Sequence, residues 1–282
     1  MIDAFLTPFA FQFFRYGVVV ATLAGALCGL VGVYVVLKGM SYIGHGLSHA
    51  IFGGFAVAAL MGGSYFVVAG LWGFGSALII NQVTRRRVIG SDAAIGVVTT
   101  ASFAFGLALF ALFGSRGSGS FDAALFGSIL GVRASDVWGM VVVTVFAALV
   151  VFFRYRALLF STFDPEVADV SGVRTARVDA LLMLVLAASI LVSMRVVGVT
   201  LIAATLVIPA TVARMLTNSF GRMLVLATGI GAACGFVGMN LSYHLDVQSG
   251  TTIVLVGALL FTLVFAFTGP RALRRTATLD AH

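Results

Sequence analysis

The sequence has little charge and little proline for its length. Only 10% of its 282 residues are Asp, Glu, Lys or Arg, and only four are proline. Soluble domains carry about 25% charged residues, so this composition excludes an ordinary soluble protein. With 61% hydrophobic residues and a mean hydropathy of +1.13, the chain is predicted to be an all-α protein that crosses a membrane several times.

The motifs of several enzyme classes are also missing. No GxxxxGK[ST] sequence is present, so we do not expect the chain itself to bind ATP through a P-loop. No HExxH sequence is present, which argues against a zincin protease. The two cysteines, Cys28 and Cys234, form no CxxC pair and are interpreted as small hydrophobic residues. We therefore predict no enzyme activity.

The net charge of +7 would be compatible with nucleic-acid binding, but the basic residues are scattered between apolar runs. This scatter favours anchoring at a membrane surface, with no nucleic acid as a partner. A spanning helix needs about 20 mainly apolar residues. Nine segments qualify, at about 13–36, 41–61, 64–83, 93–113, 135–153, 176–194, 197–214, 220–243 and 250–268. The very tight link at Arg195 leaves open whether two of them form one interrupted helix, so eight or nine spans are expected.

The distribution of Lys and Arg predicts the orientation, because cytoplasmic loops carry an excess of both. A cytoplasmic C-terminus leaves four basic residues outside: Arg15, Arg116, Arg133 and Arg195. It places 13 inside: Lys38, Arg85, Arg86, Arg87, Arg154, Arg156, Arg174, Arg177, Arg214, Arg222, Arg271, Arg274 and Arg275. We expect a single transmembrane domain over residues 1–282, with a retained first helix.

Two linkers differ from the others. The outer one, residues 114–135, begins "GSRGSGS" and becomes apolar at 125–130, which suggests a short re-entrant piece. The inner one contains Asp164-Pro165-Glu166, which suits a helix start with Asp as the cap, Pro first and an acid in the first turn. Gly172 is a plausible stop. A short cytoplasmic helix is therefore predicted, and its acidic start favours docking onto a protein over resting on anionic lipid.

The sequence "GHGLSHA" places His45 and His49 inside the second span, where ionisable side chains are costly and usually functional. Their spacing of four residues puts both imidazoles on one helix face. Imidazole suits zinc, iron and copper, and binds manganese less strongly. Since tetrahedral coordination needs four ligands, two copies of this helix at a two-fold axis would complete a site. The alternatives are core histidines bonded to carbonyls or to Ser41 and Ser48, or haem ligation between two chains.

Six stretches in order resemble the integral-membrane permeases of ABC-type manganese and zinc uptake systems, the ABC-3 family. They are "VVLKGMSYIGHGLSHAIFGG", "SDAAIGVVTTASFAFGLAL", "LFGSILGV", "TFDPEVADVSGV", "VVGVTLIAATLVIPATVARML" and "LSYHLDVQSGTTIVLVGALLF". The resemblance covers nearly the whole chain. It implies the ABC importer permease fold in a homodimer, working with a cytoplasmic ATPase that binds ATP and an extracellular metal-binding lipoprotein in a bacterial cytoplasmic membrane.

The resemblance also implies roles for particular residues. The segment at about 163–173 is similar to the family's coupling helix, which inserts into the ATPase; its candidate coupling residues are Phe163, Asp164, Pro165, Glu166 and Gly172. His49 matches a histidine of the metal site in the transport path. At His45 most relatives have aspartate, and this departure shifts the expected cargo from manganese toward zinc or another borderline metal.

We therefore predict a permease that imports a divalent transition metal, held transiently by His45 and His49 with no permanently bound cofactor. One alternative is an ABC permease for a chelated metal, haem or siderophore. Another, from a different class, is a haem-binding membrane electron carrier.

Overall fold

The protein is described here by a computed structural model, which describes residues 7–85, 91–113, 125–128 and 132–279. Every regular element in these ranges is a helix, as expected for an all-α chain. They are η1 (Thr7–Ala10), α2 (Gln12–Leu37), α3 (Ser41–Met61), α4 (Tyr65–Arg85), α5 (Ser91–Phe113), α7 (Ala134–Phe153), α8 (Tyr155–Phe163), α9 (Pro165–Val170), α10 (Thr175–Val197), α11 (Ile202–Leu216), α12 (Phe220–Leu245) and α13 (Ser249–Leu279).

Eight of the helices in the described ranges are long and apolar enough to span a membrane: α2, α3, α4, α5, α7, α10, α12 and α13. The ninth candidate corresponds to α11, which has 15 residues and begins at Ile202 after a break at Gly198. At 1.5 Å per residue α11 is about 22 Å long, short of the roughly 30 Å hydrocarbon core. The predicted count of eight or nine is thus confirmed. Arg195 itself lies in the last turn of α10, and the interruption follows at Gly198, before the short helix α11.

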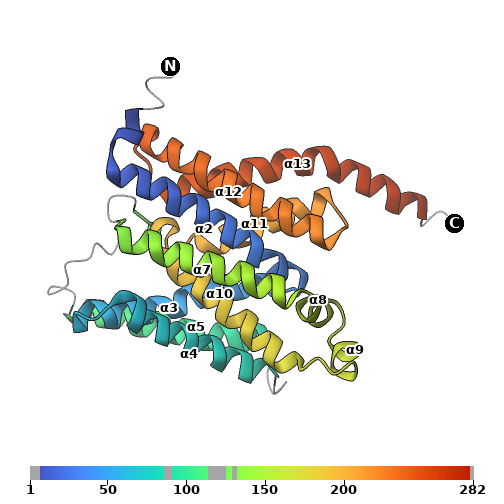
Figure 1. Ribbon diagram of the computed structural model, residues 1–282, viewed down its shortest axis with the longest axis horizontal. Helices are drawn as coiled ribbons and strands as arrows, with labels where there is room; N and C mark the ends of the chain where they lie inside the picture. The colour runs from blue at the N-terminus through green and yellow to red at the C-terminus, as the bar shows by residue number, and fades with distance from the viewer. Residues whose placement is uncertain (1–6, 86–90, 114–124, 129–131, 280–282) are drawn as a thin grey trace.

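The helices form two groups with α7 and α10 between them (Figure 1). One group contains α3, α4 and α5, and the other contains α2, α11, α12 and α13. The most buried spans are α2 and α10, and α10 packs against α2, α3, α4 and α7. Helices α8 and α9 lie at the same end of the bundle as the end of α13, and η1 and the start of α2 lie at the opposite end (Figure 1).

Helices α2 and α12 approach each other closely through glycine. A Cβ atom on Gly25 would collide with the backbone of Gly231, and one on Gly231 would collide with the backbone of Gly25. Gly29 lies in the same way against the carbonyl of Ala227. Small residues that let backbones meet are a common means of helix association in membranes, and here they fix the position of the central helix α2.

At the N-terminal end of α7, a charged pair joins three helices. Asp136 is almost completely buried, and its Oδ2 lies 3.1 Å from the Arg195 guanidinium near the end of α10. The same carboxylate oxygen accepts a hydrogen bond of 2.8 Å from the Arg133 N–H. The Arg195 guanidinium in turn lies 4.6 Å from the ring centre of Tyr65 in α4. This cluster holds α4, α7 and α10 together at one end of the bundle.

The predicted re-entrant piece lies partly outside the described residues, since 114–124 and 129–131 are not covered, and neither are Arg86, Arg87 and Arg116. The described part, 125–128, packs against the end of α10. The Ser128 N–H donates to the Arg195 carbonyl at 3.0 Å, and the Thr200 hydroxyl donates to the Leu125 carbonyl at 2.8 Å. Whether this piece enters a membrane remains a sequence prediction.

Candidate functional sites

The two histidines of α3 lie side by side. The ring centres of His45 and His49 are 4.3 Å apart, and both residues are half-buried. Tyr42 lies beyond His45 at 5.9 Å, and Phe103 of α5 lies beyond His49 at 4.5 Å. The i, i+4 spacing therefore does bring both imidazoles to one face of α3, as predicted, within a row of four rings.

The hydrogen bond of His49 determines which of its nitrogens is available. Its Nδ1 lies 2.9 Å from the backbone carbonyl of His45. A carbonyl can only accept, so Nδ1 carries the proton, and in the neutral imidazole Nε2 keeps a free lone pair. Such a bond at one ring nitrogen orients an imidazole that binds metal through the other. His49 is thus held in the form that a metal ligand requires.

The serines do not bind the rings. The Ser48 hydroxyl lies 2.7 Å from the His45 carbonyl and 2.9 Å from the Val199 carbonyl, so both of its contacts are with backbone. Ser41 is exposed at the start of α3. The alternative of core histidines bonded to carbonyls or serines therefore holds only for His49 Nδ1, which bonds a carbonyl. The His45 ring and His49 Nε2 have no hydrogen bond to the described residues.

Glycines next to the histidines let helix α5 pack closely against α3. A Cβ atom on Gly46 would approach Ile95 and Thr99 too closely, and one on Gly53 would collide with Ser102. These glycines therefore let α5 approach α3 closely. Helix α5 forms one wall beside the histidine pair and supplies Phe103, but no third metal ligand.

Within the described ranges, no group of three or more His, Cys, Asp or Glu residues is placed to hold a metal ion. His244 was the remaining described histidine; it lies in the last turn of α12 beside Tyr243. Tyr243 packs on Phe14 near the start of α2, whereas His45 follows the end of α2. The pair on α3 is therefore an incomplete site in a single chain.

The second candidate site is the short helix α9, whose predicted start is confirmed. Asp164 is the N-cap and its carboxylate accepts a 3.0 Å hydrogen bond from the Val167 N–H, with Pro165 as the first helical residue. Glu166 lies in the first turn, and Gly172 follows the helix with φ of +83°. A residue with positive φ after a helix is usually glycine, which explains the stop.

The segment around this helix exposes three large apolar side chains. Phe163 is 61% exposed, Val167 49% and Val170 92%. Of the six residues of α9, only Ala168 is buried. The helix projects from the end of the bundle (Figure 1). Exposed valines on a six-residue helix, beyond the spanning segments, are typical of a surface that another protein covers.

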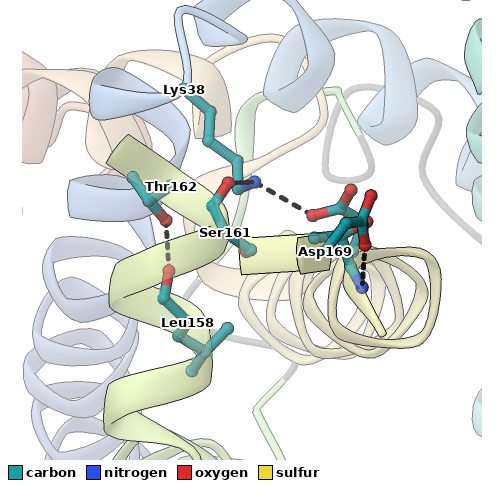
Figure 2. Close-up of polar contacts among 7 residues, drawn as sticks. Lys38, Leu158, Ser161, Thr162 and Asp169 are labelled. Atoms are coloured by element: carbon teal, nitrogen blue, oxygen red, sulfur yellow. Dashed lines mark hydrogen bonds and ion pairs between the residues drawn. The ribbon is translucent and has the colours of Figure 1, made fainter. Parts of the chain in front are cut away.

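A set of polar contacts fastens α8 and α9 to the bundle (Figure 2). The Lys38 ammonium donates to the Ser161 carbonyl at 2.8 Å and to Asp179 Oδ1 at 2.9 Å. Asp169 of α9 accepts hydrogen bonds from the N–H and hydroxyl of Thr175, at 3.2 and 2.7 Å. In the sequence Lys38 was interpreted only as a charge that orients the chain. The chain has one lysine and 16 arginines, and this difference in residue type was the signal that could have singled out position 38.

Comparisons with known proteins agree with these features. The family model described as "ABC 3 transport family" matches residues 10–268. The chain is 36% identical, over 92% of its length and 88% of the relative's, to the manganese transport system membrane protein MntC of Halalkalibacterium halodurans. Its fold matches the solved structure "PsaBC from Streptococcus pneumoniae in complex with Fab" with a TM-score of 0.84, at 31% identity over 94% of this chain and 95% of that one.

A more distant likeness concerns the fold alone. An inward-facing "putative metal-chelate type ABC transporter" superimposes with a TM-score of 0.68 at 17% identity, over 88% of this chain and 84% of that one. The helical order, the projecting α9 and the family match over nearly the whole length lead to one conclusion. This chain belongs to the ABC 3 transport family.

Proposed function

We propose that the protein is the permease subunit of an ATP-binding cassette importer that carries a divalent transition-metal ion, manganese or zinc, across the cytoplasmic membrane of a bacterium. The family match and relatives named for manganese transport support this function. Eight apolar helices provide the membrane-spanning body. Family membership stands against the haem-binding electron carrier, and no described contact favours a chelated cargo over a bare ion.

The metal site consists of His45 and His49 from two copies of the chain. The single observation that supports it best is the half-buried pair on one face of α3, with no third ligand among the described residues. Two such faces at a two-fold axis supply four imidazoles, which is the number that a tetrahedral ion needs. Residues contributed by separate subunits can move apart, so binding is transient, as transport requires.

The choice of metal depends on His45. Relatives named for manganese transport support manganese, which prefers hard oxygen ligands such as carboxylates. Four neutral imidazoles in place of carboxylates favour a borderline ion such as zinc. A site of this composition therefore binds Zn²⁺ more tightly than Mn²⁺.

The partners follow from α9 and from the family. A cytoplasmic ABC ATPase docks on the exposed side chains of Phe163, Val167 and Val170 and supplies ATP hydrolysis. An extracellular metal-binding lipoprotein delivers the ion at the opposite end. The C-terminus is cytoplasmic, since α13 ends at the same end of the bundle as α9 (Figure 1) and the basic residues concentrate on that side.

The test is metal uptake by proteoliposomes that contain the permease and its ATPase and are supplied with the metal-binding lipoprotein. His49→Ala is expected to abolish uptake while the purified complex keeps its normal yield, because it removes one of two ligands from each chain. His244→Ala is the matched control, since it removes a histidine at the other end of the bundle, and it should transport normally. Uptake by His49→Ala at the rate of His244→Ala would contradict the site.

A further inference from the structure

Lys38 occupies a junction between the two candidate sites. It follows the last residue of α2 and precedes the start of α3 by three residues. His45 lies seven residues further along the chain. The ammonium group is largely shielded, with a side-chain exposure of 11%. Because a lysine ammonium is a compact charge with three donors, it can satisfy acceptors on two different elements.

Those two elements are the helices on either side of α9. The Ser161 carbonyl belongs to the last turn of α8, immediately before α9. Asp179 belongs to the second turn of α10, immediately after α9. Figure 2 shows the Lys38 side chain reaching from the end of α2 to Ser161. One ammonium therefore holds both ends of the α8–α9–α10 segment to the turn that leads into α3.

Helix α9 is fastened to α10 by a separate contact. Asp169 Oδ1 accepts from the N–H and the hydroxyl of Thr175, the first residue of α10. A displacement of α9 must then move the start of α10, and Asp179 moves with it. Through Lys38 that movement reaches the α2–α3 turn. The sequence of contacts runs from Asp169 to Thr175, along α10 to Asp179, and across to Lys38.

The packing next to this ion pair is incomplete. A cavity of about 110 Å³ lies beside the ion pair, between the start of α10 and the neighbouring ends of α3, α4 and α5. Its lining includes Lys38, Ile43, Asn81 and Asp179. Helix α10 also packs directly against α2 and α3, and the Lys38 contacts add a charged connection between α10 and the α2–α3 turn at the level of this cavity.

We propose that Lys38, with Asp179, is the positioning residue that transmits movement of the ATPase-docking helix α9 to α3 and its metal-binding histidines. The proposal rests on the proposed function and adds to it a named route between ATP hydrolysis and the metal site. Lys38 does not touch the ion. Its loss therefore affects the coupling between hydrolysis and transport, and leaves metal binding and ATPase docking intact.

The experiment uses the complete complex in proteoliposomes and measures the number of metal ions transported per ATP hydrolysed. The variants are Lys38→Met, Asp179→Asn, the double variant and Lys38→Arg. Arg156→Met is the matched control, because it removes an exposed cation from α8. Metal binding, retention of the ATPase and thermal stability are measured on the same samples, with Mn²⁺ and Zn²⁺ as the probes.

Lys38→Met and Asp179→Asn are each expected to lower the transport-to-hydrolysis ratio by about tenfold or more, within the range of allosteric coupling energies. The double variant should be no worse than Lys38→Met, since both remove one link. Lys38→Arg should retain part of the ratio and Arg156→Met all of it. If Lys38→Met fails to assemble, Asp179→Asn decides the question, because it keeps the amine and its Ser161 bond.

A wild-type ratio in Lys38→Met or in Asp179→Asn would overturn the proposal. A lower transport-to-hydrolysis ratio that only accompanies an equal loss of metal binding or thermal stability would also overturn it, because that pattern indicates a purely structural role. The proposed function fails separately: if the wild-type complex itself transports neither Mn²⁺ nor Zn²⁺, the permease assignment is wrong whatever the variants do.

Discussion

At the residue scale, the proposed metal ligands are the two imidazoles of His45 and His49, which lie in contact on one face of α3. The spacing of His45 and His49 predicted a shared face, and their ring centres are 4.3 Å apart. The sequence could not show that the His45 carbonyl accepts from His49 Nδ1, because such bonds depend on rotamers. Metal binding by the pair stays a prediction.

The identity of residue 45 is expected to set the metal preference. His45→Asp places one hard carboxylate in each chain in place of a borderline imidazole. The ratio of Mn²⁺ to Zn²⁺ affinity should rise by about tenfold or more, which corresponds to about 1.4 kcal/mol. Calorimetry on the purified complex measures both affinities. An unchanged ratio would show that residue 45 does not contact the ion.

The buried charge at the start of α7 is expected to matter for stability. Asp136→Ala removes the partner of Arg195 and the acceptor for the Arg133 N–H. Breaking a buried pair from one side costs about 3 kcal/mol, so the melting temperature of the detergent-purified protein should fall clearly. Asp92→Ala is the control, since Asp92 lies in the first turn of α5 and is exposed. Equal melting temperatures for the two variants would contradict this account.

At the element scale, the bounds of the short helix α9 were predicted closely, whereas the start of α11 was not. Asp164, Pro165 and Gly172 act on backbone groups within a few residues, so the bounds of α9 could be predicted closely. The seventh apolar run was placed at 197–214 and begins at Ile202, because Gly198 has φ of +86° and ends α10. Hydropathy does not register such a break, since apolar residues continue through it.

The exposed side of α9 yields a prediction about assembly. Val170→Asp places a charge on a side chain that is 92% exposed, so the permease itself should fold normally while the ATPase no longer co-purifies. Leu245→Asp is a control of similar chemistry on the last residue of α12, 61% exposed and at the other end of the bundle. Affinity purification of the permease with its ATPase compares them, and full retention of the ATPase by Val170→Asp would refute docking at α9.

Helix α12 offers a matched pair of glycines. A Cβ atom on Gly231 meets the backbone of Gly25, whereas one on Gly229 meets nothing within 4 Å. Gly231→Ala is expected to force α2 and α12 apart and destabilise the protein by about 1–3 kcal/mol. Gly229→Ala should be neutral or stabilise by up to about 1 kcal/mol through helix propensity. Thermal unfolding distinguishes them, and similar curves would mean that the helices do not meet as described.

At the scale of the whole molecule, composition and hydropathy were enough for the all-α class and for eight of the spans. The arrangement of α10 among α2, α3, α4 and α7 was not predictable, since apolar periodicity does not say which neighbour a buried helix meets. The link from Lys38 to Ser161 and Asp179 joins residues more than 120 positions apart. Contacts over such separations follow from the fold and have no local signal.

A single chain supplies half of the proposed metal site, so the central claim concerns two chains. The most direct test is the number of metal ions bound per permease chain in the purified complex at saturating Zn²⁺, measured by calorimetry together with protein quantification. The account predicts one ion for every two chains in the wild type and none in His49→Ala. One ion per chain, or undiminished metal in His49→Ala, would contradict it.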